Sequence, residues 1–251
     1  MAKTKLRWIF PPAQDLQTIE VKDINNIGVS GVITRVRKSI YFYDEQDNLC
    51  KVLYSTDGGD SHTEQPRFYR LKKDEWSMLT PATNRVRRGY AGRCAKGGGG
   101  FDTPYFGDPY HIQCHRMVAY AWCKHPEEAE KDPLWYKYGH GFECDHKNCD
   151  HNDCCPKNLE WLTTEANHTR YHKRQKPLIA LYGKTFLRLI SYEHLDQIFA
   201  LTDAQFAYFL EGVQEIMHID PTPLSVEAIN FDIEQILDDI SAYSNQSVLK
   251  K

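Results

Sequence analysis

The pattern of apolar and polar positions divides this 251-residue chain into a strand-rich first part and a helical last part. Near the start, β-branched and aromatic residues alternate with polar ones over residues 27–37 and 40–43, and a polar turn at 44–48 precedes a second run at 49–54. This alternation is typical of strands that bury one face. We therefore predict a β-hairpin or a small sheet, followed by a polar loop over residues 56–65.

Apolar residues recur at helical spacing in the last third of the chain. Thr202 and Ser225 are each placed to cap the start of a helix, and Pro221 and Pro223 separate the two helices. The first stripe comprises Phe206, Phe209, Leu210, Val213 and Met217, and the second comprises Val226, Ile229, Ile233, Ile236, Leu237 and Ile240. Stripes of this kind predict either a core or the seam of a homodimer formed through these helices.

The most specific pattern lies in the middle of the chain, in residues 142–174. Asp145 and His146 precede a run rich in Cys, Asn and Asp. Asn158 then opens a short apolar strand, and a segment of helical composition carrying Asn167 follows. Asn158 lies 12 residues after His146, and Asn167 lies 9 residues after Asn158. We predict a strand, an irregular loop, a second strand and then a helix.

These residues and spacings resemble the active-site hairpin and helix of the HNH endonucleases, also called the ββα-metal or His-Me finger nucleases. The segment 115–119, which reads HRMVA and opens a predicted helix, resembles the helix that precedes this motif in many phage-type members. Together the matching segments span residues 115–174. The resemblance implies a ββα-metal catalytic core, which we place over residues 101–176. With the strand and helix patterns on either side, we predict an α+β fold with a β-rich N-terminal region over residues 1–100 and a helical C-terminal region over 177–251.

The resemblance assigns a role to each of four side chains. A neutral imidazole with a pKa of about 6.5 can take a proton from water at cellular pH, so His146 is the predicted general base. A hard cation such as Mg²⁺ prefers oxygen ligands, and the resemblance places Asp145 and Asn167 on one such ion. Asn158 corresponds to the structural Asn of the family, whose amide holds the backbone that carries the His. Adjacent strand residues face opposite sides, so the Asp-His pair can serve metal and water together only where the strand ends or kinks.

Four cysteines crowd into twelve residues of this motif, from Cys144 to Cys155. Thiolate-rich clusters suit Zn²⁺, and a structural zinc held by Cys149, His151, Cys154 and Cys155 would brace a loop with little core of its own. Cys144 or Cys114 is a substitute ligand. The alternative is a set of small buried thiols, because the motif has no CxxC pair and two adjacent cysteines seldom share one metal.

Basic residues favour nucleic acid as the partner of the first two-thirds of the chain. Residues 1–176 hold 27 Lys and Arg against 23 Asp and Glu, a net charge of +4, whereas residues 177–251 hold 4 against 11, a net charge of −7. The glycine-rich segment 84–100 either reaches phosphates or a minor groove, or is only a solvated loop. The predicted contacts to double-stranded DNA comprise Arg85, Arg87, Arg88, Arg93, Lys96, His115, Arg116, Arg170, Lys173 and Arg174. For His115, a packing or capping role fits the sequence equally well.

Neither a signal peptide nor a membrane span is apparent. The apolar run at residues 8–10 is cut short by Pro11 and Pro12, and nothing approaches the roughly 18 apolar residues of a transmembrane helix. We therefore expect a cytoplasmic protein, in a bacterial cell or a phage-infected host, with its eight cysteines as thiols or metal ligands.

The sequence as a whole predicts a metal-dependent DNA endonuclease of phage or homing type that uses Mg²⁺ or a similar divalent cation. A restriction-type enzyme with the same core is the close alternative. The alternative from another class is a zinc-stabilised DNA-binding protein with a vestigial nuclease site. A protein that only binds DNA has no need of Asp145, His146 and Asn167 together, which favours the enzyme.

Overall fold

The computed structural model describes residues 7–9, 16–21, 31–43, 49–59, 64–72, 75–79, 113–131, 141–219 and 225–248. The fold is of the mixed α+β class, as predicted. The chain forms two compact units: the first comprises residues 1–146 and 151–164, and the second comprises residues 147–150 and 165–251. The division into three parts at residues 100 and 176 stays a prediction. The basic segment 84–100 lies outside the described residues.

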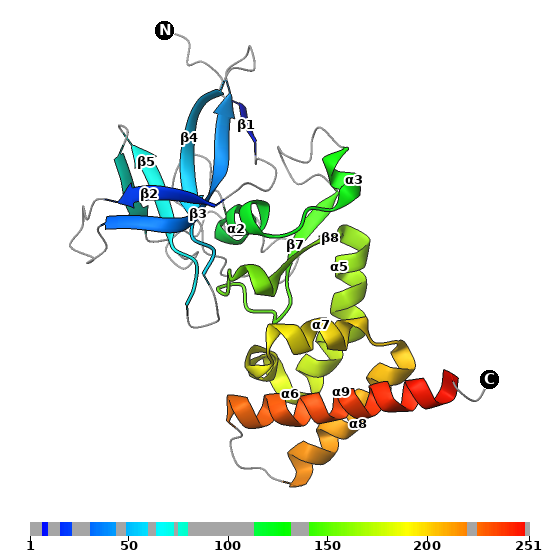
Figure 1. Ribbon diagram of the computed structural model, residues 1–251. Coiled ribbons are helices and arrows are strands. Elements are labelled where there is room, and N and C mark those ends of the chain that lie inside the picture. The colour runs from blue at the N-terminus through cyan, green and yellow to red at the C-terminus, as the bar shows by residue number, and fades with distance from the viewer. Residues whose placement is uncertain are drawn as a thin grey trace. The chain divides into compact units, whose positions relative to one another are not determined.

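The first unit contains a six-stranded sheet (Figure 1). Its strands are β1 (Arg7–Ile9), β2 (Gln17–Val21), β3 (Gly31–Tyr43), β4 (Leu49–Thr56), β5 (Phe68–Lys72) and β6 (Glu75–Leu79). The order is β1-β3-β2-β6-β5-β4, and β4 also pairs with β3, so the order closes on itself. The predicted hairpin is confirmed as β3 and β4. Strand β3 runs unbroken from residue 31 of the first predicted segment through the second, and residues 27–30 lie outside the described residues.

Alternation along the strands explains the core of this sheet. In β2, Ile19 and Val21 are buried while Glu20 between them is exposed. Val36 of β3 and Tyr69 of β5 complete the buried cluster, because their side chains face the same interior. Removing these apolar side chains from water is the main contribution of the sheet to stability.

Helix α2 (Cys114–Trp122) packs against β3 and β4 and against the hairpin strands β7 and β8 of the same unit. It begins within one residue of the predicted start, and residues 117–121 are buried. Its last residue, Trp122, is fixed by polar contacts: Nε1 donates to the carbonyl oxygen of Thr56 at 3.2 Å, and the Arg37 guanidinium lies 4.6 Å from the ring centroid. The short helix α3 (Glu127–Glu130) follows.

The central motif has the predicted order of strand, loop, strand and helix. Strand β7 (Phe142–His146) pairs in antiparallel fashion with β8 (Leu159–Thr163), and the 3₁₀ turn η3 (Pro156–Asn158) leads directly into β8. Helix α5 (Thr164–Arg170) begins at the next residue. Asp145 lies opposite Glu160, and His146 lies opposite Leu159 at the end of the hairpin.

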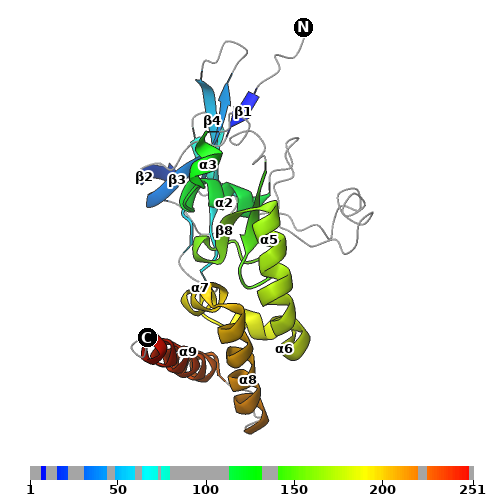
Figure 2. The same cartoon turned by 90° about the vertical axis from the view of Figure 1, so that its right-hand side faces the viewer.

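The second unit is helical. Helix α5 continues through the π-helical turn η4 (Tyr171–Gln175) into α6 (Lys176–Leu189), as Figure 2 shows. Helices α7 (Tyr192–Ala200), α8 (Asp203–Ile219) and α9 (Val226–Val248) follow, and α9 packs against α6, α7 and α8. Both predicted stripes contribute to one buried core, which includes Leu178, Leu187, Leu195, Ile198, Phe209, Val213, Ile229, Ile233 and Ile240. The homodimer through these helices stays a prediction.

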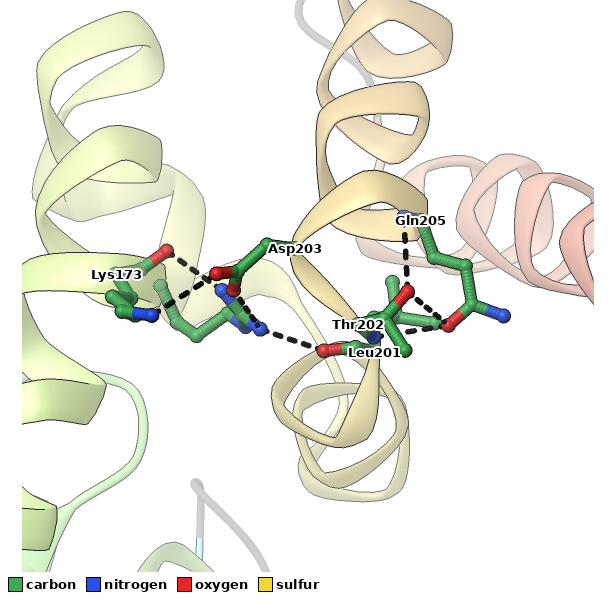
Figure 3. Close-up of polar contacts among 6 residues, drawn as sticks. Lys173, Leu201, Thr202, Asp203 and Gln205 are labelled. Atoms are coloured by element: carbon green, nitrogen blue, oxygen red, sulfur yellow. Dashed lines mark hydrogen bonds and ion pairs between the residues drawn. The ribbon is translucent and has the colours of Figure 1, made fainter.

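Both predicted helix starts are confirmed by their caps. The Oγ1 of Thr202 accepts from the backbone N–H of Gln205 at 3.3 Å, and the Oε1 of Gln205 accepts from the backbone N–H of Thr202 at 2.9 Å (Figure 3). This reciprocal pair is a capping box. The Oγ of Ser225 accepts from the N–H of Ala228 at 3.2 Å at the start of α9. Across the described residues, no helix combines the length and the apolar character needed to traverse a lipid bilayer.

Candidate active site

The hairpin places Asp145 and His146 where β7 stops. The strand ends at His146 and a turn follows, which is the condition under which these two neighbours can serve one site. His146 is 4% exposed, whereas Asp145 is half-buried. The carboxylate thus lies nearer to solvent than the imidazole beside it.

Two other imidazole rings of the first unit lie against the ring of His146. The centroid of the His146 ring lies 4.9 Å from that of His115, at the start of α2, and 4.9 Å from that of His151, in the loop after the hairpin turn. Both contacts are edge-on, with interplanar angles of 63° and 71°. His115 is 8% exposed, and its Nδ1 is buried without a hydrogen-bond partner within the part of the chain that the structure describes. The structure therefore gives His115 a buried position directly against the predicted base.

Burial keeps the His146 and His115 rings neutral. The pKa of His146 is lowered to about 3, chiefly by desolvation and then by the neighbouring His151, while Asp153 opposes the shift. Desolvation also lowers the pKa of His115 well below its usual value, and His146 is the next contribution. Neutral imidazole is the form that can accept a proton, so His146 is in the protonation state of a base at pH 7.

Asn158 closes the loop between the two strands. It is fully buried at the end of η3, and its Nδ2 donates to the carbonyl oxygen of Asp153 at 2.9 Å. Its backbone N–H donates to the carbonyl oxygen of Cys155, also at 2.9 Å. This geometry is that of a bracing residue, which is the role that the resemblance implies.

Gln65 and Asp153 form a second brace, which the sequence did not suggest. The Nε2 of Gln65 donates to Oδ1 of Asp153 at 2.7 Å, and its Oε1 accepts from the backbone N–H of Cys154 at 2.9 Å. The same Oδ1 of Asp153 accepts from the N–H of Cys155 at 3.2 Å. A glutamine in a polar loop, 88 residues before its partner, carries no local signal of such a role.

The described cysteines include six that are thiols and not disulfides: Cys114, Cys123, Cys144, Cys149, Cys154 and Cys155. Desolvation raises the pKa of the Cys114 and Cys144 thiols well above their usual value, which favours the protonated form. Cys154 and Cys155 are buried in the first unit, whereas Cys149 belongs to the second, where it packs against the helical core. Over the described ranges, no three His, Cys, Asp or Glu side chains are grouped to hold a metal ion. The zinc site with Cys149, His151, Cys154 and Cys155 stays a prediction.

Asn167 and three of the predicted DNA-binding residues lie in the second unit. Asn167 is half-buried on α5, and each unit is described by itself, so its convergence with Asp145 on one ion stays a prediction. The guanidinium of Arg170 lies 5.0 Å from the ring centroid of Phe199. Lys173 pairs with Asp203 at 3.0 Å.

Arg174 is engaged within the helical unit. Its Nη2 lies 2.9 Å from Oδ1 of Asp203 and donates to the carbonyl oxygen of Leu201 at 2.6 Å, and its guanidinium stacks 4.7 Å from the ring centroid of Phe206. Figure 3 shows Asp203 and Leu201 of this network at the start of α8, together with Lys173. The side chain is 11% exposed. Arg174 therefore has a structural role that the sequence did not suggest.

Of the predicted DNA contacts in the first unit, two lie among the described residues. Arg116 is half-buried on α2, with its guanidinium 5.9 Å from the ring centroid of Trp161 on β8. His115 is the buried ring already placed against His146. The contacts predicted for Arg85, Arg87, Arg88, Arg93 and Lys96 lie outside the described residues.

Comparison with known proteins adds no relative: no family model, no curated protein sequence and no solved structure matches the chain.

Proposed function

We propose that the chain is a metal-dependent endonuclease of the HNH class, of phage or homing type, which hydrolyses phosphodiester bonds of double-stranded DNA. One observation carries the proposal. Asp145 and His146 end the first strand of a hairpin, Asn158 braces its loop, and the helix bearing Asn167 starts where the second strand stops. The order of strand, loop, strand and helix, with these residues at its junctions, supports the proposal.

In this proposal His146 accepts the proton of the attacking water. A pKa of about 3 guarantees the neutral form, but a base this weak needs help when it becomes an imidazolium. Asp153 already acts in that direction, since it raises the pKa of His146. The negative phosphate of bound DNA would act in the same direction, because a nearby opposite charge favours the protonated imidazole.

Asp145 and Asn167 would hold the divalent cation. A carboxylate and an amide oxygen are hard donors, which suits Mg²⁺, and the half-buried position of Asp145 leaves its carboxylate accessible. Such a cation, when bound, supplies positive charge that stabilises the charge developing on the phosphate.

A plasmid assay tests this function. Wild-type protein should convert supercoiled DNA to nicked or linear forms with Mg²⁺ and stop when EDTA is added. His146→Ala should lower the rate by roughly 10²- to 10⁴-fold, the usual contribution of a general base. His172→Ala, an exposed histidine on η4, is the matched control and should cleave like the wild type.

The assay also separates the alternatives. Wild-type protein that binds DNA in a gel shift, but shows no Mg²⁺-dependent cleavage, would refute the enzyme. It would favour the zinc-stabilised DNA-binding protein. Sequencing the products of randomised DNA would distinguish a long homing-type target from a short restriction-type one.

A further inference from the structure

The four residues that follow His146 belong to the helical unit and not to the hairpin that carries His146. Three of them, Lys147, Asn148 and Asp150, are polar or charged and yet at most 7% exposed. Burying such groups is unfavourable unless they find partners. The charged partners of Lys147 and Asp150 come from helices of the second unit.

The Lys147 side chain ends in an ion pair with α7. Its Nζ lies 2.6 Å from Oδ1 of Asp196, and the side chain is 9% exposed. Most of the lysine is thus buried, and the carboxylate meets the ammonium where it reaches the surface. A buried lysine held at its charged end has little freedom to change rotamer.

The main chain of Lys147 is held separately. Its carbonyl oxygen accepts from Nε2 of Gln175, which is 1% exposed on the π-helical turn η4, at 3.2 Å. That turn is in turn fixed by Arg174, through Asp203 and the carbonyl oxygen of Leu201. Side chain and backbone of one residue are therefore bound by two different helical elements.

The end of the segment is held as well. The Nε of Arg188 on α6 lies 3.2 Å from Oδ2 of Asp150. The backbone N–H of Asp150 donates to Oδ1 of Asn148 at 2.8 Å, and Cys149 between them has a φ of +57°. Non-glycine residues seldom adopt this conformation, so the turn is specified by its contacts and not by local preference.

We propose that the helical unit positions the predicted base: Lys147, Gln175 and Asp196 hold the backbone that leaves His146 and so limit the orientations of the imidazole. The proposal rests on the proposed nuclease function. His146 is joined to Lys147 by one peptide bond, so rotation of the strand end requires Lys147 to move. Gln175 and Asp196 are positioning residues, which act through Lys147 and touch no substrate.

Two variants remove the two contacts independently. Gln175→Met removes the amide donor at similar volume, and Asp196→Asn removes the charge partner of Lys147. Asp196→Glu keeps the charge and should restore wild-type behaviour. Asp238→Asn, an exposed position on α9, makes the same charge change outside the segment and is the matched control. Far-UV circular dichroism verifies that each variant is folded at the assay temperature.

Two readouts separate positioning from simple destabilisation. By mass spectrometry of the full chain without DNA, the amides of residues 147–150 should exchange at least about tenfold faster in Gln175→Met and Asp196→Asn than in the wild type. In the plasmid assay kcat should fall by roughly 10- to 100-fold, the size expected for a misplaced catalytic group, while KM stays unchanged. Asp196→Glu and Asp238→Asn should match the wild type in both.

The outcomes are distinct for the two proposals. Unchanged exchange in both variants would overturn the positioning role, and so would faster exchange with a wild-type kcat. A wild-type protein that never cleaves DNA would refute the nuclease function. Faster amide exchange in the variants of such a protein would still show that Gln175 and Asp196 restrain residues 147–150.

Discussion

Gly58 offers a sharp test of how α2 is held on the sheet. It follows β4 with a φ of +81°, and a Cβ added there would lie 2.8 Å from both Cδ2 and Cε2 of the Trp122 ring. The ring has little room to move, because Nε1 is bonded to the carbonyl oxygen of Thr56 and the Arg37 guanidinium lies against it. Gly58→Ala should therefore be strongly destabilising.

The expected size has two parts. A left-handed backbone costs an L-residue roughly 1–2 kcal/mol. Forcing a methyl group into a filled space costs roughly 1–3 kcal/mol more. Gly141 has a similar φ of +77°, but a Cβ there would meet nothing within 4 Å, so Gly141→Ala should show only the first part. The difference between the two variants isolates the contact with Trp122.

Urea unfolding followed by tryptophan fluorescence measures both losses in the same unit of the protein. Gly58→Ala should lose about 1–3 kcal/mol more free energy of unfolding than Gly141→Ala. In the background of Trp122→Phe, which has a smaller ring, that excess should shrink. Equal losses in the two alanine variants would refute the packing of Trp122 on Gly58.

Two further substitutions test the loop brace and the helix cap. Asn158→Ala removes the donor to the carbonyl oxygen of Asp153 in a fully buried site and should cost about 1–3 kcal/mol in thermal unfolding; a change below about 0.5 kcal/mol would contradict the bracing role. Thr202→Ala should lower the free energy of unfolding of the helical unit by about 1 kcal/mol, measured by circular dichroism during urea unfolding. Thr202→Ser keeps the hydroxyl and should have the stability of the wild type.

The parts of the structure that could be predicted are those determined by residues close together in the sequence. The capping box joins Thr202 to Gln205, three residues away, and therefore shows in the sequence as a local pattern. The order of the hairpin and α5 follows from residues within one short motif. The apolar residues of helix α2 follow helical spacing within its nine residues. In each case the signal and the structure occupy the same stretch of chain.

The parts that could not be predicted depend on distant partners. Alternation marks which residues of β2 face the core, but not that β2 pairs with β3 on one side and, in parallel, with β6 on the other. Gln175 looks like an ordinary polar residue of a helix, and only the fold brings the carbonyl oxygen of Lys147, 28 residues earlier, against its amide. The contacts that brace the candidate site are therefore harder to predict from the sequence than the residues proposed for its chemistry.

The net charges of the two parts of the chain differ less when the chain is divided into its two compact units than when it is divided at residue 176. The second unit, residues 147–150 and 165–251, holds 9 Lys and Arg against 13 Asp and Glu, a net charge of −4, which leaves +1 for the first unit. The acidic residues are thus partly matched by basic ones of the same unit. Long-range attraction of DNA by net charge would be correspondingly small, so the proposed DNA binding would depend on local basic groups.

Lys173 and Arg174 show which local groups are suited to that task. Both meet Asp203, but Lys173 is 56% exposed and its ion pair with Asp203 is of the surface kind, which water and salt screen and which contributes little to stability. Lys173 can exchange Asp203 for a phosphate at little loss. Arg174 cannot, because leaving Asp203 would also break its bond to the carbonyl oxygen of Leu201 and uncover Phe206. Of these two adjacent cations, Lys173 is therefore the one suited to a phosphate, and Arg174 the one that holds the turn bearing Gln175.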